Sequence, residues 1–266
     1  SSDLSPGAIN VFRANKDFQD ALLAEGIHIY MPTTQEWNRN EQQQLKEVSI
    51  EDLLPRDEIS IDMESVGAML HGKRILITGS AGSIGSEMVR QIAKYSPAEL
   101  ILIDSAETPQ HDIRLMMAKQ FPEIKAETIV TTICSKSRME HIFKTYLPDY
   151  VFHAAAYKHV PMMENNPCES IQNNVYGTKI LADLAIKYGV KKFVMISTDK
   201  AVNPTNVMGC SKRICEIYVQ SLNKAVKEGI VKGETQFVTT RFGNVLGSNG
   251  SVIPLFKKQI KAGGPV

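Results

Sequence analysis

Two adjacent ionisable residues follow an apolar run in the second half of the chain. Asp199 and Lys200 come soon after residues 192–197, which are typical of a buried strand, and Thr198 immediately precedes them. A carboxylate and an ammonium group in this position could accept and donate protons during catalysis. The alternative interpretation is an ordinary exposed ion pair. Because ligands bind at the carboxyl edge of parallel sheets, we favour the catalytic interpretation.

A helix expected at residues 206–227 carries a second group of candidates. Met208 and Lys212 are four positions apart, so both side chains lie on one helical face. A thioether cannot act as a base. Either this site is inactive, or a neighbouring segment supplies the proton acceptor. Cys210 and Cys215 lie on the same helix, where cysteine usually serves packing.

A glycine-rich loop connects an expected strand at residues 74–77 with an expected helix at residues 84–95. Gly79, Gly82 and Gly85 have the spacing GxxGxxG, which allows a sharp turn, a close approach to a pyrophosphate and tight helix packing. The free N–H groups and the dipole at the helix start favour phosphates. The loop residues that we expect to contact a dinucleotide are Gly79, Ser80, Gly82, Ser83, Ile84 and Gly85.

An acidic residue ends the second expected strand, about 20 residues beyond the loop. The carboxylate of Asp104 could accept hydrogen bonds from ribose hydroxyls, and it would repel a 2′-phosphate. Ser105 follows, and no arginine stands close behind, so we favour NAD over NADP. The alternative is a solvated strand end. Three small residues follow another expected strand, at residues 150–153: Ala154, Ala155 and Ala156. Small side chains here could let the backbone lie against a cofactor. The alternative is ordinary close packing.

Short β-branched runs alternate with longer helical patterns from Lys73 onward. The expected strands cover residues 74–77, 100–103, 128–133, 150–153, 192–197 and 236–242. The expected helices cover residues 84–95, a segment from 108, 167–189 and 206–227. Continuous apolar strands indicate a sheet covered on both faces. This alternation predicts an α/β fold with a doubly wound parallel sheet.

Composition excludes several classes of function. The chain has 266 residues, 43% hydrophobic residues and a formal net charge of +1, which gives no broad attraction to nucleic acid or an anionic membrane. No apolar run approaches the roughly 18–20 residues that cross a bilayer. The four cysteines form no CxxC pair, so we expect neither a metal site nor a disulfide framework.

The first part of the chain has a different texture from the rest. Residues 18–25 are weakly helical, residues 27–30 could form a short strand, and the segment that follows is polar, then acidic. We expect residues 1–56 to be the tail of a preceding domain and a linker, and residues 57–266 to form the NAD-binding catalytic domain. The chain begins at Ser1 and stops after a Gly-Gly-Pro run, so we interpret it as a piece of a longer protein.

Several motifs together resemble one family, the CapD-like nucleotide-sugar 4,6-dehydratases of polysaccharide biosynthesis, which are extended short-chain dehydrogenases. The matching segments are ITGSAGSIG at 77–85, HAAAYKHVP at 153–161, NNVYGT at 173–178, STDKAVNPTNVMG at 197–209 and RFGNVLGSNGSVIP at 241–254. The resemblance implies a Rossmann-type fold whose C-terminal substrate-binding part is truncated here. This sequence differs from the family pattern at Thr131 and Thr132, where relatives usually have Gly-Asp near the adenine.

The resemblance also implies a reaction. Tightly bound NAD would take a hydride from sugar C4 and return it to C6 after water leaves, converting UDP-N-acetylglucosamine to a 4-keto-6-deoxy sugar. Other short-chain dehydrogenases carry a catalytic Tyr where this chain has Met208, and the large membrane-anchored members of the resembled family carry Met there. We expect no role for metal ions or nucleic acid.

Residue roles follow from the resemblance. Asp199 is expected to protonate the C6 hydroxyl, Lys200 to act at C5, and Thr198 to polarise the C4 oxygen. The acceptor of the C4 hydroxyl proton stays open, with Asp199 a candidate for both steps. Lys212 is expected to hold the nicotinamide ribose. The expected substrate contacts are Lys158, His159, Asn174 and Asn244.

Two other functions stay open: a nucleotide-sugar epimerase of the same fold, and a degenerate, cofactor-bound scaffold domain. We expect a UDP-sugar as the ligand and a homo-oligomer. The full-length protein is expected at the cytoplasmic face of the bacterial inner membrane, held by a segment missing from this chain, and the fragment itself is expected to be soluble.

Overall fold

The computed structural model describes part of the chain in detail. The described residues are 62–243, Asn15, Tyr30–Pro32, Leu45–Glu47, Val245, Phe256, Gln259 and 262–263. The chain divides into two compact units, one of Ser1–Ile61 with Val252–Val266 and one of Asp62–Ser251.

The first unit contains a short hairpin among its described residues. Strands β1 (Tyr30–Pro32) and β2 (Leu45–Glu47) pair antiparallel. The strand expected at residues 27–30 meets β1 only at Tyr30, and the helix expected at residues 18–25 lies outside the described residues. The division expected between residues 56 and 57 stays a prediction.

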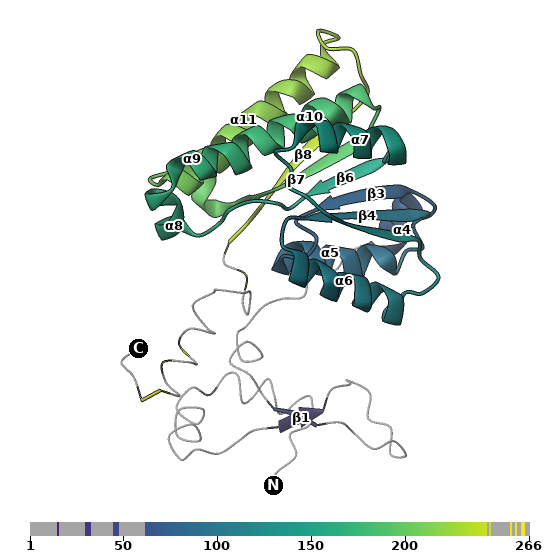
Figure 1. Ribbon diagram of the computed structural model, residues 1–266, viewed down its shortest axis with the longest axis vertical. Coiled ribbons are helices and arrows are strands. Elements are labelled where there is room, and N and C mark those ends of the chain that lie inside the picture. Colours follow the sequence, from purple (N-terminus) through teal and green to yellow (C-terminus); the bar gives the residue numbers. More distant parts are fainter. Residues whose placement is uncertain are drawn as a thin grey trace. The chain divides into compact units, whose positions relative to one another are not determined.

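The second unit is built on a six-stranded sheet (Figure 1). Its strands are β3 (Arg74–Thr78), β4 (Glu99–Asp104), β5 (Ala126–Val130), β6 (Tyr150–His153), β7 (Lys192–Thr198) and β8 (Gln236–Phe242). Their order across the sheet is β5-β4-β3-β6-β7-β8, and all neighbours are parallel. The order reverses between β3 and β6, which makes the sheet doubly wound and confirms the predicted fold class.

Helices connect these strands and cover both faces of the sheet. They are α4 (Met63–Leu70), α5 (Ser83–Ala93), α6 (Glu107–Gln120), α7 (Lys136–Tyr146), α8 (Val160–Asn165), α9 (Pro167–Ser170), α10 (Gly177–Lys187) and α11 (Val207–Lys227). A 3-10 turn, η2 (Asp199–Ala201), follows β7. The sequence patterns did not predict α4, α7 and α8.

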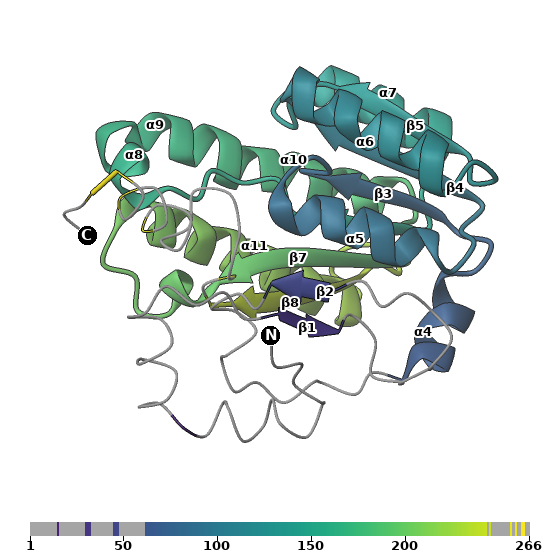
Figure 2. The same cartoon turned by 90° about the horizontal axis from the view of Figure 1, so that it is seen from below.

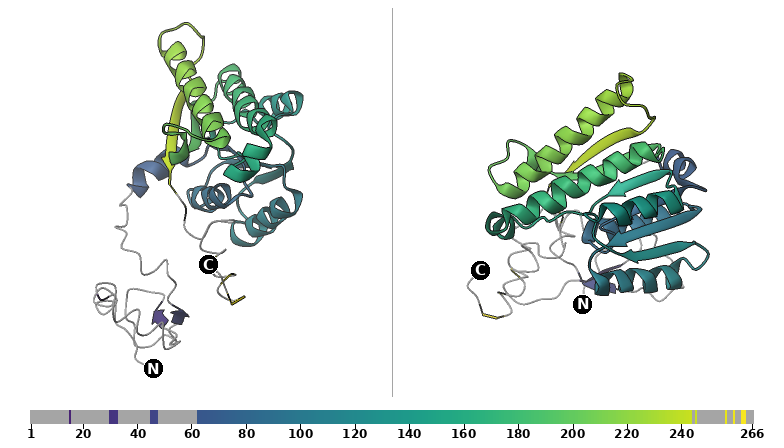
Figure 3. Two further views of the ribbon diagram at one scale, coloured as in Figure 1. Left: turned by 90° about the vertical axis from the view of Figure 1, so that its left-hand side faces the viewer. Right: turned by 45° about the horizontal axis from the view of Figure 1, so that its top comes forward.

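The core has two layers, one on each face of the sheet, and Figures 1 and 3 show helices covering both faces. Ile75 and Ile77 of β3 pack with α4, α5 and α6, whereas Leu76 faces α7, α10 and α11. All three are completely buried. A strand buried on both faces has no polar alternation, which explains the continuous apolar run.

The helix expected at residues 167–189 is interrupted. Helix α9 passes into a π-helix, η1 (Ile171–Tyr176), before α10 begins. A π segment contains an extra residue per turn, and such segments often occur at functional sites. Here the π-helix determines where Asn174 lies, and simple helical periodicity could not predict that.

Helix α11 is the long helix seen beside α10 in Figure 2. Its N-cap residue, Asn206, accepts a hydrogen bond from the Gly209 N–H at 2.8 Å through its side-chain oxygen. This cap fixes where the helix starts. The predicted helix at residues 206–227 is therefore confirmed almost to the residue, and it brings Met208 and Lys212 into its first two turns.

Candidate active site

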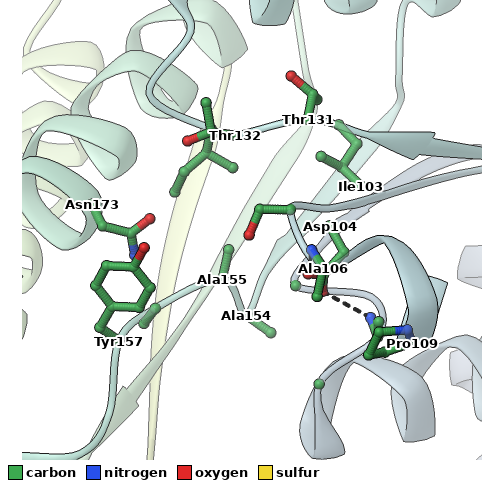
Figure 4. A pocket seen from close by; sticks show the side chains of 16 residues that line it. Ile103, Asp104, Ala106, Pro109, Thr131, Thr132, Ala154, Ala155, Tyr157 and Asn173 are labelled. Atoms are coloured by element: carbon green, nitrogen blue, oxygen red, sulfur yellow. Dashed lines mark hydrogen bonds between the residues drawn. The ribbon is translucent and has the colours of Figure 1, made fainter.

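A pocket of about 260 Å³ lies at the carboxyl ends of β3, β4 and β6 (Figure 4). It is lined by Gly79, Ala81, Gly82, Ile103, Asp104, Ser105, Ala106, Pro109, Thr131, Thr132, Ile133, Ala154, Ala155, Ala156, Tyr157 and Asn173. Tyr157 and Asn173 lie toward one side of the pocket and Pro109 toward the other. The switch point of a doubly wound sheet is where such folds bind dinucleotides.

The glycine loop has its shape because two positions leave no room for a side chain. Gly79 has a φ of +70°, and an added Cβ would lie 2.6 Å from the Ala155 backbone nitrogen. A Cβ on Gly85 would lie 1.9 Å from the Gly79 carbonyl oxygen. The loop therefore packs directly on Ala154–Ala155 on one side and on the start of α5 on the other.

Most N–H groups of the loop are already bonded within the chain. Gly79 and Ser80 donate to the Ile103 carbonyl at 2.8 and 3.2 Å, and Gly82 donates to the Gly79 carbonyl at 3.1 Å. The first N–H groups of a helix have no partner within that helix. Phosphate binding would therefore depend on Ile84 and its neighbours at the start of α5, where the helix dipole adds to the attraction.

Asp104 joins the loop to the end of β4. Its carboxylate accepts hydrogen bonds from the Ala81 N–H at 3.0 Å and the Ala106 N–H at 2.9 Å. A carboxylate has about four acceptor positions, so Asp104 retains the capacity to accept from ribose hydroxyls. Asp104 and Ser105 both line the pocket, as expected of cofactor contacts.

Ser80 lies differently from the other loop candidates. It is completely buried, and its hydroxyl donates to the Gln110 side-chain oxygen at 2.8 Å. Gln110 in turn donates to the Leu102 carbonyl at 2.7 Å. Ser80 does not line the pocket, so this geometry gives its side chain a supporting position beneath the loop and no direct contact with a cofactor there.

A buried histidine stands behind the three alanines that line the pocket. The ring of His153 lies 2.8 Å from the Thr78 hydroxyl on one nitrogen and 2.8 Å from the Thr178 hydroxyl on the other. Burial, with a smaller effect of the Lys212 charge, lowers the pKa of His153 to about 3. The neutral ring therefore connects β3, β6 and α10 without placing a charge in the core.

The proton-transfer candidates lie at the same edge of the sheet, beyond β7. Thr198 ends β7, and its hydroxyl donates to the Asp199 carboxylate at 2.8 Å. The Lys200 ammonium lies 3.3 Å from that carboxylate. The Asp199 and Lys200 side chains are 54% and 37% exposed. Hydrogen bonds from Thr198, and then from Lys200, lower the pKa of Asp199 despite partial burial. Asp199 is therefore ionised.

Helix α11 places its two candidates beneath this turn. Met208 and Lys212 are both almost fully buried, at 3% and 4% exposure. A Cβ on Gly209 would lie 2.2 Å from the Lys200 carbonyl oxygen, so the glycine lets η2 rest directly on the helix. Burial lowers the pKa of Lys212 although Cys215 and Glu216 act in the opposite direction.

The ammonium group of Lys212 has no ion-pair partner within the part of the chain that the structure describes. A buried ammonium without a compensating acceptor is costly, and Asp or Glu usually supplies one. Hydroxyl groups of a bound ligand would supply the missing acceptors. This is the position expected of a residue that holds a ribose.

The predicted substrate contacts fall into three groups. Lys158 and His159 are exposed in the segment after β6, and His159 is the N-cap of α8. Asn174 is 1% exposed, and its amide bonds the Tyr157 N–H at 2.8 Å, the Tyr157 carbonyl at 3.0 Å and the Ser211 hydroxyl at 2.9 Å. Asn244 lies outside the described residues.

Asn174 therefore has a different position from the one expected. Its amide is occupied by bonds within the chain, so the geometry offers no direct contact with a substrate. It instead fixes the backbone of Tyr157, which lines the pocket. Sequence reasoning also missed Tyr157 and Asn173 as pocket residues, although both stand inside motifs that carried the resemblance.

Two absences apply to the residues that the structure describes. In that part of the chain, no His, Cys, Asp and Glu side chains gather in a group that could hold a metal ion. Across the same residues, no helix combines the length and the apolar character that a membrane span requires.

Comparisons with known proteins agree with this architecture. The chain is 46% identical over 246 residues to the capsular polysaccharide biosynthesis protein CapD of Staphylococcus aureus, covering 91% of this chain and 40% of CapD. It is 37% identical over 197 residues to an inverting UDP-N-acetylglucosamine 4,6-dehydratase of Campylobacter jejuni, covering 73% of this chain and 56% of that enzyme. The chain thus spans roughly half the length of these relatives or less.

A solved structure shows the same fold with its cofactor. The Bordetella bronchiseptica enzyme WbmG in complex with NAD is 25% identical, with a TM-score of 0.58 over 74% of this chain and 61% of WbmG. The family model described as "Polysaccharide biosynthesis protein" matches residues 75–266. With the sheet, the glycine loop and the turn after β7 all in place, the chain belongs to this polysaccharide biosynthesis protein family.

Proposed function

We propose that the chain is the catalytic part of an NAD-dependent nucleotide-sugar 4,6-dehydratase. The observation that carries the proposal is one sheet edge that combines a pocket of about 260 Å³ at the glycine loop, an ionised Asp199 paired with Lys200, and a buried Lys212 that forms no ion pair with any described residue. The similarity to the Campylobacter dehydratase supports UDP-N-acetylglucosamine as the substrate. The product is the 4-keto-6-deoxy sugar, for use in capsule, O-antigen or related glycans.

NAD fits the residues that are present. Gly79 and Gly85 let the loop pack against Ala154–Ala155 and the start of α5, which is the tight turn that a pyrophosphate-binding loop requires. Asp104 accepts hydrogen bonds from the adenosine ribose, and Lys212 donates to the nicotinamide ribose. When bound, NAD would supply a hydride acceptor for sugar C4 and return the hydride to C6.

The residues after β7 handle the protons. The ionised Asp199 accepts the proton of the C4 hydroxyl and later delivers it to the C6 hydroxyl, which leaves as water. Lys200 acts at C5, where it removes the proton and returns it. The Thr198 hydroxyl donates to Asp199 in the structure, and it polarises the C4 oxygen only after its single proton turns from that carboxylate to the sugar. Met208 takes no proton and shapes the floor of the site.

The substrate side is the less complete part of the proposal. Lys158 and His159 are exposed, and we assign them to contact with the nucleotide-sugar. Asn244 approaches the diphosphate, as the family resemblance implies. Asn174 contributes through the backbone of Tyr157.

The proposal also covers the rest of the protein, its location and its oligomeric state. Residues 1–56 would link the catalytic domain to a preceding domain, and a membrane segment elsewhere in the protein would hold it at the cytoplasmic face of the bacterial inner membrane. We also propose a homo-oligomer. It is supported by two apolar side chains on α11, Ile214 and Ile217, which are 44% and 50% exposed.

The test uses the full-length protein with UDP-N-acetylglucosamine and mass spectrometry of the product. We expect a product lighter by one water. In the Asp199→Asn variant we expect turnover to fall about 100-fold or more, which is the scale of lost acid–base catalysis. Glu228→Gln, at the far end of α11, is the control and should keep wild-type turnover. Turnover of Asp199→Asn within a few-fold of wild type contradicts the assignment.

The same experiment separates the two rival functions. An epimerase yields a product of unchanged mass, because no water leaves. A cofactor-bound scaffold yields no product while retaining NAD. The position of Met208 opposes the epimerase, since a thioether cannot take the place of a Tyr base.

A further inference from the structure

The pocket has an end beyond Asp104 that the residue roles above leave unassigned. Thr131 and Thr132 follow directly on β5, and both line the pocket together with Asp104 and Pro109 (Figure 4). Val130, the last residue of β5, stands opposite Asp104 of β4. The Thr131 N–H donates to the Asp104 carbonyl at 2.9 Å. This bond fixes the two threonines beside Asp104.

The strand order decides which part of a dinucleotide reaches this end. The glycine loop follows β3, and β4 and then β5 lie beyond it toward one edge of the sheet. In the proposed binding the loop takes the pyrophosphate and Asp104 takes the adenosine ribose. The base and the pyrophosphate are attached at opposite ends of that ribose, so the base continues toward β5. Thr131 and Thr132 are the pocket residues that it meets there.

The Thr132 side chain is held in one orientation by a local hydrogen bond. Its hydroxyl oxygen accepts from the Cys134 N–H at 3.2 Å, in a turn where a side chain bonds the backbone two residues later. Among the described residues, none accepts the proton of this hydroxyl. The hydroxyl therefore has one proton and one lone pair left for a ligand, so it can either donate or accept.

The pocket offers the base no carboxylate other than Asp104. Among the described residues that line the pocket, Asp104 is the one charged side chain. Its oxygens already accept from the Ala81 and Ala106 N–H groups, and its remaining capacity is assigned to the ribose. The polar side chains at the β5 end are hydroxyls. A hydroxyl can bond the 6-amino group of adenine or the 6-carbonyl of hypoxanthine, whereas a carboxylate can bond only the amino group.

We propose that Thr132 makes the base end of this pocket tolerant of the group at the 6-position, so that the chain binds nicotinamide hypoxanthine dinucleotide nearly as well as NAD. Thr132 is then the residue that determines base specificity. This inference rests on the NAD part of the proposed function and does not depend on the sugar chemistry.

The test is a competition on the full-length holoenzyme. The protein is incubated with a large and equal excess of both dinucleotides until the bound ratio is constant, then it is gel-filtered, and the bound dinucleotides are quantified by mass spectrometry. The bound ratio gives the relative affinity without any turnover. We expect the wild-type protein to prefer NAD by less than fivefold. A preference of fivefold or more overturns the proposal.

Thr132→Asp changes the hydrogen-bonding chemistry and keeps the turn. Aspartate forms the same turn with the backbone two residues later, so a carboxylate takes the place of the hydroxyl. It accepts from the adenine amino group, but it opposes the hypoxanthine carbonyl with a second acceptor. We expect the preference for NAD to rise at least fivefold over that of the wild type, and a smaller rise overturns the proposal.

Two matched variants control for side-chain loss and for charge. Thr132→Ser keeps the hydroxyl and should keep the wild-type ratio within twofold. Thr108→Asp adds the same charge at an exposed position of α6, next to Pro109, without lining the pocket. Its ratio should also stay within twofold of wild type. A shift in Thr108→Asp as large as that in Thr132→Asp would reflect charge alone and would overturn the proposal.

Thr132→Val gives a second measurement, which serves where Thr132→Asp does not fold. Valine has nearly the same shape as threonine but no hydroxyl. Dialysis of the holoenzyme against a series of concentrations of each dinucleotide measures the two Kd values. We expect both Kd values to weaken about fivefold, because each base loses one hydrogen bond. Unchanged Kd values for both dinucleotides overturn a contact between Thr132 and the base.

The outcomes separate this proposal from the dehydratase proposal. Protein that binds both dinucleotides but does not convert UDP-N-acetylglucosamine contradicts the dehydratase and supports the tolerance at the base. Protein that converts the sugar but strongly prefers NAD overturns the tolerance and leaves the dehydratase in place. Protein that binds neither dinucleotide overturns both.

Discussion

The two ends of the site are built in different ways. Around β3, β4 and β6 the pocket is made largely of backbone and small side chains, and most N–H groups of the glycine loop are bonded within the chain. Beyond β7 the site is made of long side chains, with an exposed Asp199–Lys200 pair above a buried Lys212 that makes no ion pair with the described residues. The first end is complete before a ligand arrives. The second end obtains its missing partners from the ligand.

This difference predicts where a small change has large consequences. The glycine loop packs directly on neighbouring backbone, so it cannot accept an extra methyl group unless a strand or a helix moves. The exposed turn after β7 can shift without a steric clash, so a change there costs only the alignment of its side chains with the substrate. The following predictions test the contrast, from the largest expected effect to the smallest.

Gly85→Ala should disrupt the cofactor end most strongly. The added Cβ would lie 1.9 Å from the Gly79 carbonyl oxygen, and neither backbone segment can move freely. We expect a loss of about 3 kcal/mol in NAD binding or in stability, equivalent to about 100-fold. The measurement is NAD released from purified protein, together with thermal unfolding.

Gly82→Ala is the matched comparison on the same loop. Its φ is −72°, which any residue adopts, and its Cβ would lie 3.3 Å from the Gly79 oxygen. We expect a clearly smaller loss of NAD. Equal NAD content in Gly85→Ala and the wild type would contradict the packing argument.

Gly209→Ala should damage the proton-transfer end and leave the cofactor in place. The Cβ would lie 2.2 Å from the Lys200 carbonyl oxygen, so η2 must lift away from α11. We expect turnover to fall about 50-fold, because misplaced catalytic groups lose alignment, with NAD content unchanged. Ser221→Ala, on the exposed face of the same helix, is the control. Loss of NAD in Gly209→Ala would show that the two ends are not separate.

Acid should destabilise the cofactor end through His153, whose pKa falls to about 3 in the folded chain. In the unfolded state the His153 ring binds a proton near pH 6.5, whereas in the folded state it does not. The free energy of unfolding therefore has its full value above pH 6.5 and decreases as the pH falls toward 3. Between pH 7 and pH 5 this loss is about 2 kcal/mol.

The measurement is urea unfolding of wild-type protein and His153→Gln at both pH values. The Gln variant should be less stable at pH 7, because the ring bridges Thr78 and Thr178. Its stability should depend less on pH than that of the wild type by about 2 kcal/mol. A parallel pH dependence of the two proteins would exclude His153 as the titrating group.

Ser80→Ala should have the smallest effect. The lost hydroxyl leaves the buried Gln110 oxygen without its partner, at a cost of about 1 to 2 kcal/mol in stability. NAD content should stay within twofold of wild type, because Ser80 does not line the pocket. Ser137→Ala, at an exposed position on α7, controls for the loss of a serine. A large fall in NAD would restore the direct contact expected from the sequence.

The sequence patterns predicted the strands of the sheet and the start of α11 well, except that β5 covers Ala126–Val130 and not the expected residues 128–133. Apolar runs such as residues 74–77 and 100–103 are local features, and a strand buried on both faces is encoded in its own residues. The patterns left α4, α7 and α8 unassigned. They also treated residues 167–189 as a regular helix, because the periodicity of a short π segment resembles that of an α-helix.

The sequence predicted which residues belong to the site better than it predicted which of them contact one another. Asp104 and the three alanines line the pocket as expected, and the residues Thr198, Asp199 and Lys200 share one turn. Asn174 and Ser80 turned inward instead, toward partners many positions away in the chain. A motif records that a residue is required, but it does not record whether the side chain faces a ligand or the core.

The sequence by itself determined the glycine spacing, the strand that precedes it and the Asp–Lys pair beyond the fifth strand, because each depends on neighbours along the chain. Only the tertiary structure decided that Glu216 meets Arg241, that His153 connects Thr78 with Thr178, and that Lys212 is buried with no ion pair to the residues that the structure describes. These contacts depend on how helices pack across the sheet, and packing joins residues that local patterns cannot relate.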